Sequence, residues 1–457
     1  MKKYIYTAVM LLFVCLLQAQ EKTWTGKSVD FAHGRLMVSP NKRFLIHADG
    51  TPFFYLGDTS WELFHRLNEE ETDRYLENRR AKGFTVLQAV ILAELDGLNT
   101  PNRNGDKPFI DNDPEKPNEA YFKWVDKVIR KAEEKGMYIG LLPTWGDKVD
   151  PQWGVGPAVL NPEKAMAYGK YLGRRYKDFP NIIWINGGDR LGGGDNYTTW
   201  DALGKAIKAE DPNHLMTFHP MGEQSSARWF HECDWLDFNM CQTGHGQRSY
   251  DIYRQLLVAD YNREPVKPCL DGEPRYEDHP VSWMPEIYGW FDHVDVRQSM
   301  YWNLFSGAFG YTYGCHPVWQ FKSSRDEPVG LVRHNWDEVL NLEGAFDLIH
   351  ARRLLESFDF TSRIPDQHII ISPQHFATDV AVATRGKDYA FVYLPNGHPV
   401  EVAMDKIPEA KQLRLQWYNP RNGEYTDIQS INAKGTYQAK PPTSGRGNDW
   451  ILVMKAF

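Results

Sequence analysis

The chain has 457 residues, of which 42% are hydrophobic and 25% charged, proportions typical of a soluble globular protein with room for a large and a smaller domain. Its formal net charge of −8 argues against nucleic acid as a partner, because nucleic-acid-binding proteins carry basic surfaces that neutralise phosphates. Aromatic residues make up 14%, including 16 Trp and 23 Tyr. Part of this aromatic content builds the core, and the rest is typical of proteins that stack against flat apolar faces such as those of sugar rings.

Residues 1–19 have the features of an export signal, with a short basic start, an apolar core from Ala8 to Leu17 and a cleavage site before Gln20. The apolar run is too short to span a bilayer. Cys15 raises a lipid anchor as an alternative, although the preceding residues lack the small side chains expected there. We therefore expect an exported, periplasmic protein, at the cell surface if Cys15 is lipidated, with no transmembrane segment after cleavage.

Strand and helix patterns alternate from Phe53 onward. The predicted strands are Phe53–Leu56, Val86–Leu92, Tyr138–Leu142, Ile182–Ile185, Leu215–Phe218, Leu236–Met240, Lys267–Leu270 and Phe309–Tyr313. Predicted helices include one capped by Asn68, then Glu163–Tyr176, Trp200–Ala209, Tyr250–Ala259, Val294–Phe305 and Trp336–Phe358. Apolar strands followed by helices form a parallel sheet covered on its outer face. Eight such units favour a closed (β/α)8 TIM barrel over an open doubly wound sheet.

After Ile364 the pattern changes to short strands separated by turns such as Asn396-Gly397 and Asn422-Gly423. The expected strands are Ile369–Ile371, Val380–Thr384, Tyr389–Leu394, Leu413–Tyr418 and Trp450–Met454. Short strands with turn residues and no helix pattern indicate a small β-sandwich. The predicted organisation is a signal peptide over 1–19, a barrel domain over 20–362 and a C-terminal β-sandwich domain over 363–457.

Acids, imidazoles, amides and indoles follow the predicted barrel strands, at the rim where barrel enzymes carry their active sites. The candidate substrate-binding residues are Asp58, Trp61, Trp145, Asp147, Asn186, Arg190, His219, Gln242, His245, Tyr313, His316 and Trp319. Ionised carboxylates such as Asp58 and Asp147 accept strong hydrogen bonds from a diol. The alternative for Asp58 is a helix-capping role, and each tryptophan is as compatible with the core as with a stacking platform.

Asp189 and Glu273 are 84 residues apart, the length of three strand–helix units, which puts them on strands four and seven across the barrel mouth. Glycoside hydrolysis needs one acid to protonate the leaving oxygen and one carboxylate to attack the anomeric carbon, about 5–5.5 Å apart in retaining enzymes. The pair is therefore predicted to be catalytic. Asp271, two residues before Glu273, should face the barrel wall instead. The alternative is that Asp189 caps a turn and Glu273 pairs with an arginine.

Other chemistries lack their signatures. There is no HExxH motif, the histidines do not have zinc-ligand spacings, and no Gly-x-Ser-x-Gly elbow is present, so we expect neither a catalytic metal nor a cofactor. The cysteines beyond the signal are Cys233, Cys241, Cys269 and Cys315, without CxxC spacing. One disulfide, such as Cys233 with Cys241, and buried free thiols are both compatible with the sequence.

Several motifs together carry a family resemblance. Gly57-Asp58-Thr59-Ser60-Trp61, Lys82-Gly83-Phe84-Thr85-Val86 and Trp184-Ile185-Asn186-Gly187-Gly188-Asp189 resemble the apiosidase-like proteins of glycoside hydrolase family 140. Trp417 to Gly423 resembles the small β-domain that accompanies them, sometimes labelled as collagen-binding. The resemblance covers nearly the whole mature chain. It implies an acid/base on strand four and a nucleophile on strand seven, matching Asp189 and Glu273. In most of that clan a Glu directly follows the Asn, whereas here Gly-Gly-Asp follows Asn186.

The resemblance also implies the substrate, D-apiose removed from the pectic polysaccharide rhamnogalacturonan II, whereas retention is predicted from the expected spacing of Asp189 and Glu273 and exo action from two long loops. Arg190, next to Asp189, is predicted to hold the carboxylate of a neighbouring galacturonate, the alternative being a pair with a rim acid. The loops from Ala93 to Asn118 and from Gly146 to Leu160 are expected to wall off one end of a pocket. Another exo-glycosidase of pectin or hemicellulose, for example an arabinofuranosidase-like enzyme, an endo-acting enzyme and a carbohydrate-binding protein without turnover are the alternatives. In each case the partner is an oligosaccharide.

Overall fold

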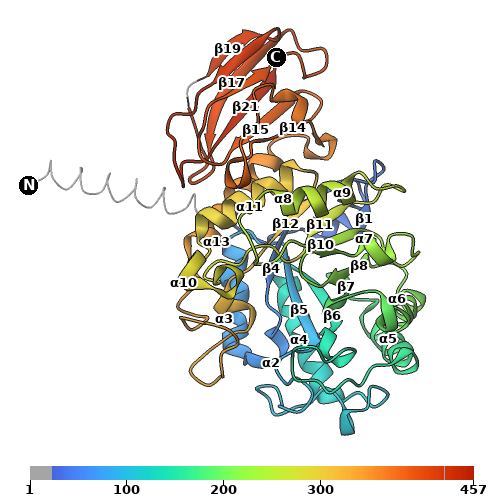
Figure 1. The fold of residues 1–457 in the computed structure, drawn as a ribbon. Helices are drawn as coiled ribbons and strands as arrows, with labels where there is room; N and C mark the ends of the chain where they lie inside the picture. The colour runs from blue at the N-terminus through green and yellow to red at the C-terminus, as the bar shows by residue number, and fades with distance from the viewer. Residues whose placement is uncertain (1–22, 427) are drawn as a thin grey trace, which may run out of the picture.

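The computed structural model describes residues 23–426 and 428–457, so the predicted export signal lies outside the described residues. It has a parallel barrel covered by helices and an antiparallel β domain that lies against it (Figure 1). Within the described ranges, the helices are too short or too polar to cross a membrane.

Eight parallel strands form the barrel. They are β4 (Tyr55–Thr59), β5 (Val86–Leu92), β6 (Tyr138–Thr144), β7 (Ile182–Arg190), β8 (Met216–Pro220), β10 (Asn239–Gln242), β11 (Cys269–Asp271) and β12 (Gly310–Tyr313). Six pair in the order β12-β4-β5-β6-β7-β8, and β10 pairs with β11. Two backbone hydrogen bonds close the ring, from Asp237 N–H to Met216 O (2.8 Å) and from Phe309 N–H to Cys269 O (3.1 Å). The predicted (β/α)8 barrel is confirmed.

The strand pattern before the barrel also follows the sequence. A small antiparallel sheet precedes the barrel, formed by β1 (Leu36–Val38), β2 (Leu45–His47) and β3 (Pro52–Phe53). Its β2–β3 hairpin turns at Asp49-Gly50, where Gly50 N–H donates to His47 O (2.9 Å), and the chain then continues into β4. A short strand, β9 (Gln224–Ser225), pairs with β10 in antiparallel fashion beyond the barrel rim.

Helices in the connections cover the outside of the barrel (Figure 1). They are α2 (Leu63–Arg66), α3 (Glu69–Ala81), α4 (Glu119–Glu134), α5 (Pro162–Tyr176), α6 (Tyr197–Glu210), α7 (Ala227–Phe230), α8 (Asp251–Tyr253), α9 (Ala259–Tyr261), α10 (Pro285–Tyr288), α11 (His293–Phe305), α12 (His316–Trp319) and α13 (Glu343–Glu356), with the π-helical η5 (Arg254–Val258) joining α8 to α9. Short 3-10 turns in the barrel domain are η1 (Phe31–His33), η2 (Ile110–Asn112), η3 (Gly146–Lys148), η4 (Gly194–Asn196), η6 (Val281–Trp283) and η7 (Phe360–Ser362).

Some helices begin where the local sequence predicts, and others begin elsewhere because of tertiary packing. Asn68 begins α3 with a capping box, because its side chain accepts from Glu71 N–H while the Glu71 carboxylate accepts from Asn68 N–H. In contrast, α13 begins at Glu343 and not at the predicted Trp336. The Trp336 indole is buried against Phe321 and beneath Arg74, so the apolar residues before Glu343 pack as turns instead of a helical face.

The C-terminal domain has two antiparallel layers. Its strands are β13 (Ile364–Pro365), β14 (Val382–Arg385), β15 (Tyr389–Leu394), β16 (Val400–Ala403), β17 (Gln412–Asn419), β18 (Glu424–Tyr425), β19 (Gln429–Asn432), β20 (Thr436–Ala439) and β21 (Trp450–Ala456), with the 3-10 turns η8 (Gln367–Ile369) and η9 (Ala377–Asp379). The larger sheet is ordered β13-β14-β15-β21-β17-β18 with β19 beside β17, and β16 pairs with β20. Apolar residues of both layers form one core. This confirms the predicted β-sandwich, although no strand forms at Ile369–Ile371, where Ile369 ends the turn η8 and Ile370 makes an isolated bridge with Val402.

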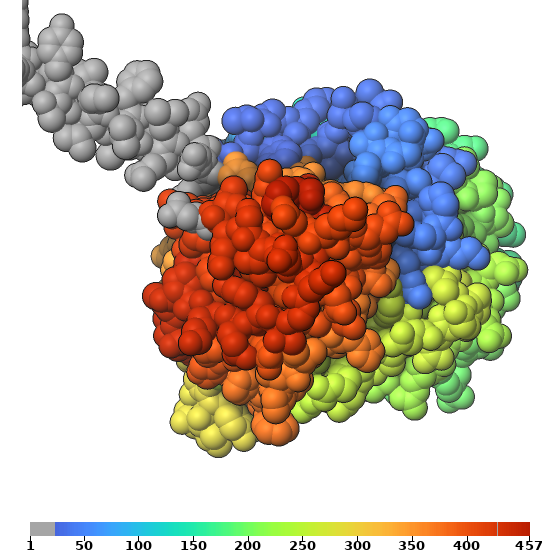
Figure 2. All heavy atoms as spheres, turned by 90° about the horizontal axis from the view of Figure 1, so that it is seen from above, coloured from blue at the N-terminus to red at the C-terminus, as the bar shows by residue number. Residues whose placement is uncertain are grey.

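A buried ion cluster joins the β domain to the barrel. The Arg297 guanidinium of α11 binds Asp449 beside β21 through Nη2 (2.8 Å) and Asp347 of α13 through Nη1 (2.5 Å). All three side chains are at most 4% exposed. The Trp302 indole of α11 also donates to Val380 O (2.9 Å). Figure 2 shows the β domain, in orange and red, lying directly against the rest of the molecule.

Breaking this cluster should weaken the whole protein. Asp449→Ala leaves Arg297 buried with one carboxylate in place of two, and removing one partner of a buried pair costs about 3–5 kcal/mol. We expect a loss of this size in the free energy of unfolding, measured by urea titration. Asp388→Ala, which removes an exposed partner of Lys455 in the same domain, is the matched control and should cost less than about 1 kcal/mol. Equal small losses in both variants would show that the two domains do not depend on the cluster.

Candidate active site

A pocket of about 780 Å³ lies at the carboxyl ends of the barrel strands. Its aromatic lining consists of Trp61, Trp145, Trp153, Tyr276, Trp283 and Trp319. Its polar lining includes Glu94, Asp189, Glu223, Gln242, His245, Glu273, His279 and Ser282. All the described residues that line it belong to the barrel domain, at or just after strand ends or in the loops that follow. A concave site with aromatic walls and a few convergent polar groups is typical of small-molecule binding.

Glu273 lies in the pocket between two imidazoles. Its Oε2 is 3.0 Å from His219 Nε2, and its Oε1 is 3.1 Å from His245 Nε2. The side chain is only 8% exposed. Burial acts to raise the pKa of Glu273, but the contacts with His219 and His245 outweigh it and lower the pKa to about 2. Glu273 is therefore ionised across the ordinary pH range.

The proton on His219 is assigned by its hydrogen bonds. Its Nδ1 accepts from the backbone N–H of Asp189 (3.3 Å), which places the ring hydrogen on Nε2, the nitrogen that lies 3.0 Å from Glu273 Oε2. The ring is held edge-on against Trp61, with centroids 5.3 Å apart, and lies beside Trp145. One buried imidazole thus connects the strand that carries Asp189 to the carboxylate of Glu273.

The backbone at the end of β7 leaves regular strand geometry. Gly187, Gly188 and Asp189 have φ angles of +89°, +131° and +56°, and the pairing of β7 with β8 shifts register between Gly187 and Arg190. A Cβ on Gly187 would lie 2.5 Å from His219 O, which excludes any larger residue there. Aspartate tolerates the left-handed region better than most side chains. The Gly-Gly-Asp sequence therefore builds a bulge that carries a short acid into the pocket.

Burial, the charge of Glu273 and a hydrogen bond from Trp153 together set the pKa of Asp189. Burial raises the pKa of Asp189 to about 6, and the negative charge of Glu273 adds to the rise. The hydrogen bond from Trp153 Nε1 to Asp189 Oδ2 (2.7 Å) acts in the opposite direction without cancelling it. The two carboxyl groups of the pocket are thus held in different protonation states below pH 6, Asp189 neutral and Glu273 charged.

Two predicted ligands turn out to hold the loop that presents Trp153. The Arg190 guanidinium donates to Asp150 O (2.7 Å) and Trp153 O and lies over the Trp153 ring. Asp147 Oδ2 accepts from Lys148 Nζ (2.6 Å) and from two backbone N–H groups of the same loop. Both side chains are buried outside the pocket lining. The predictions of Arg190 as a galacturonate clamp and of Asp147 as a sugar ligand are therefore wrong, and Arg190 does not pair with a rim acid either.

Asp58 is also placed away from the pocket. Its Oδ2 accepts from Tyr75 OH (2.5 Å) and Arg79 Nε (2.6 Å), both on α3. Residues of a strand alternate between its two faces, and Tyr55 of β4 points into the barrel, where its OH donates to Gln88 Oε1. Asp58 has the opposite parity and therefore faces the helix layer. Asp58 forms a fully buried ion pair with Arg79, and it is therefore neither a sugar ligand nor a helix cap.

The same parity corrects two further predictions. Asn186 Nδ2 donates to Trp200 O of α6 (2.8 Å), and Tyr313 OH donates to Glu277 Oε2 (2.6 Å). Both face the outer layer, and Glu277, which also accepts from Gly344 N–H, lies there outside the pocket lining. His316 lies behind the lining, with its ring 4.4 Å from that of His279. Burial lowers the pKa of His316 to about 3, so it is neutral.

The remaining predicted residues come together as expected. Those that line the pocket are Trp61, Trp145, Asp189, Gln242, His245, Glu273 and Trp319, with His219 buried beneath them. Asp271 faces the wall as predicted, since its Oδ2 accepts from Thr243 Oγ1 (2.6 Å) and from Asn303 Nδ2 (3.2 Å) of α11. The four cysteines are free thiols, which resolves the alternatives that the sequence left open.

Glu94, Trp153, Tyr276, His279 and Trp283 line the pocket but were not predicted. Glu94 lies two residues after the end of β5, so the strand-end rule applied to this second strand would have found it. Burial raises the pKa of Glu94 well above its ordinary value, and the nearby Asp189 and Asp147 raise it further. Trp153 lies in a loop and Trp283 at the end of the short turn η6, and neither segment has a periodic pattern that would have signalled it.

The comparisons with known proteins agree with this geometry. The family model "Apiosidase-like, catalytic domain" matches residues 39–362, and the model "Putative collagen-binding domain of a collagenase" matches residues 364–455. A solved structure described as a glycoside hydrolase is 34% identical with a TM-score of 0.87, covering 94% of this chain and 98% of that one. A glycoside hydrolase family 5 structure from Bacteroides vulgatus is 33% identical with a TM-score of 0.87, covering 94% and 95%. A comparison with curated protein sequences found no match.

The barrel, its carboxyl-lined pocket and these relatives define a glycoside hydrolase. The family model spans most of the chain, and the chain belongs to the apiosidase-like family. The family predicted from the motifs around Asp58 and Asp189 is thereby confirmed.

Glu94 should act as a neutral hydrogen-bonding group in this pocket. Glu94→Gln keeps the shape and the absence of charge, so we expect kcat/KM to fall about threefold, whereas Glu94→Ala should lose about tenfold or more, mainly through KM. Steady-state kinetics at pH 5 on both variants tests this. If Gln is as damaging as Ala, an ionised carboxylate is required at this position.

Proposed function

We propose that the enzyme is an exo-acting, retaining glycoside hydrolase that releases D-apiose from side chains of rhamnogalacturonan II. Asp189 acts as the general acid and then as the general base, and Glu273 acts as the nucleophile. The observation that carries the assignment is the opposite shift of the two pKa values within one pocket, because separated pKa values are the mark of an acid and a nucleophile that work together.

The first step follows from these protonation states. Neutral Asp189 donates its proton to the glycosidic oxygen as the bond to the anomeric carbon breaks, and Glu273 forms a covalent bond to that carbon from the other side. Proton loss leaves Asp189 ionised, so it accepts a proton from a water molecule that then hydrolyses the glycosyl-enzyme. His219 and His245 hold the Glu273 carboxylate in place throughout.

The pocket supports exo action on a small sugar. Glu94 and Leu95 from one long loop and Trp153 to Val155 from the other contribute to its walls, as expected for a site closed at one end. The Trp61 and Trp145 rings lie 5.1 Å apart at its base and offer an apolar wall to a sugar ring. Arg190 is bound to backbone carbonyls of its loop, and no arginine is among the residues that line the pocket. We therefore assign recognition of the adjoining galacturonate to no arginine. The proposed substrate is extracellular, which fits the export predicted from residues 1–19.

Activity should follow the protonation of the two carboxyl groups. Because Asp189 must be protonated and its pKa is about 6, kcat/KM should fall about tenfold per pH unit above pH 6. Because Glu273 must be ionised and its pKa is about 2, kcat/KM should fall on the acid side only near pH 2, where the folded protein itself begins to lose stability. A pH–rate profile of the wild type measures both limbs. A profile that stays level to pH 8 would contradict Asp189 as the acid.

Replacement of each carboxylate should have a distinct chemical signature. Glu273→Ala should lose at least about a thousandfold in turnover, because the attacking group is removed. Added azide should rescue it by giving a glycosyl azide of inverted configuration, whereas Asp189→Ala should yield the retained configuration on a substrate with a good leaving group. Glu277→Gln, outside the pocket, is the control and should keep most turnover per folded molecule. If the Glu273→Ala variant keeps a tenth of wild-type turnover, the assignment of Glu273 as the nucleophile is wrong.

The substrate itself is tested by sugar analysis after incubation with rhamnogalacturonan II oligosaccharides. We expect free apiose from the wild type and none from Glu273→Ala. Release of arabinose or another pentose in place of apiose would show that the proposed substrate is wrong and would favour an arabinofuranosidase-like enzyme. Binding of the oligosaccharide without any sugar release would indicate a carbohydrate-binding protein that has lost turnover.

A further inference from the structure

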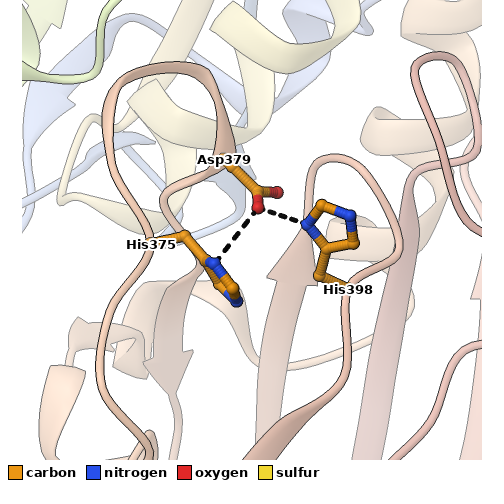
Figure 3. A group of neighbouring side chains, drawn as sticks. All are labelled: His375, Asp379 and His398. Atoms are coloured by element: carbon orange, nitrogen blue, oxygen red, sulfur yellow. Dashed lines mark hydrogen bonds and ion pairs between the residues drawn. The ribbon is translucent and has the colours of Figure 1, made fainter.

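Two histidines and an aspartate converge on the surface of the β domain (Figure 3). His375 precedes η9, Asp379 ends it, and His398 follows the Asn396-Gly397 turn that joins β15 to β16. Both imidazoles direct Nδ1 toward Asp379 Oδ2, His375 at 3.4 Å and His398 within hydrogen-bonding distance. One ligand atom from each residue lies within 4.8 Å of the others. No other group of this kind is found among the described residues.

We propose that His375, Asp379 and His398 form a structural binding site for a divalent transition-metal ion, Zn²⁺ in particular. Zinc–nitrogen and zinc–oxygen bonds of about 2.0–2.1 Å in a tetrahedron place neighbouring ligand atoms about 3.3 Å apart. The separation of 3.4 Å between His375 Nδ1 and Asp379 Oδ2 already has this value. His398 Nδ1 lies closer to Asp379 Oδ2 than this, so the exposed His398 side chain must turn outward to admit the ion, and a water molecule completes the tetrahedron.

The donor set selects the class of metal. Two imidazole nitrogens with one carboxylate suit zinc, cobalt, nickel or copper, whereas Ca²⁺ and Mg²⁺ prefer sites made of oxygen. Asn396 Nδ2 donates to the other Asp379 oxygen, Oδ1, at 3.2 Å and so fixes the carboxylate with Oδ2 toward the histidines. Such a second hydrogen bond to a ligating carboxylate is a regular feature of metal sites. Neither imidazole is buried, so an ion reaches the cluster directly from solvent.

The site would stabilise the contact between the two domains. The segment that carries His375 and Asp379 is held to the barrel through Gln298 Nε2, which donates to Thr378 O (2.8 Å), and through the Trp302 indole. An ion bound to both His398 and Asp379 ties this segment to the β15–β16 turn. The site is separate from the pocket, because none of its three residues is among those that line it. It is therefore compatible with glycoside hydrolysis that needs no metal.

The test uses full-length protein without a polyhistidine tag, stripped with EDTA and titrated with ZnCl₂ by calorimetry. We expect one equivalent bound by the wild type and by His368→Gln, a control that removes an exposed histidine of the same domain. His398→Gln and Asp379→Asn should lose that equivalent. At saturation Zn²⁺ should raise the melting temperature of the wild type by about 2–4 °C and leave His398→Gln unchanged. Ca²⁺ should give no binding, and EDTA should leave wild-type turnover unchanged.

Cobalt gives an independent signature, since tetrahedral Co²⁺ absorbs visible light. Co²⁺ titration of the stripped wild type should develop these bands and that of His398→Gln should not. The proposal is overturned if the wild type binds no Zn²⁺, or if one equivalent persists in both His398→Gln and His375→Gln, which would assign the metal to other histidines. Loss of turnover together with the metal would likewise overturn a purely structural site.

Discussion

The left-handed segment at Gly187, Gly188 and Asp189 is the backbone constraint on which the pocket depends. A regular strand would send every second side chain toward the helices, and a longer acid directly after Asn186 would need no bulge. Here the shift in register supplies the reach that the short aspartate lacks, and it also aims the Asp189 N–H at His219. Strain of this kind persists only where the surroundings over-determine it. The tight contacts of Gly187 with β8 and of Gly188 with Trp145 provide that support.

The barrel could be predicted from the sequence because its signal is repeated. Buried strands read as continuous apolar runs, so Val86–Leu92 was found with both its ends, as was Tyr389–Leu394 in the β domain. The errors lie where tertiary packing overrides local pattern. Trp336 was predicted to begin a helix because it is apolar, but it is buried in a turn before α13. Ile369 was predicted to begin a strand, but it belongs to a 3-10 turn.

The site was predicted in part, and the misses have one main physical origin. Strand-end position shows which residues are near the rim, but side-chain parity decides which of them face the pocket. Asp58, Asn186 and Tyr313 satisfy the first condition and fail the second. Arg190 and Asp147 fail for another reason, because their partners are backbone groups of a loop whose path the sequence does not reveal. Buried charges of this sort are satisfied locally wherever the chain offers carbonyl or N–H groups.

The Trp153 indole connects two properties that are usually treated apart. It is 39% exposed and lines the pocket, and its N–H stabilises the ionised form of Asp189. Proton affinity and ligand position are therefore thermodynamically linked: a ligand that turns the indole away removes a donor from the carboxylate and strengthens its hold on the proton. By reciprocity, protonation of Asp189 loosens the loop. A ligand with this effect would make the loaded enzyme titrate at a higher pH than the empty one, so that the alkaline limb of kcat would lie above that of kcat/KM.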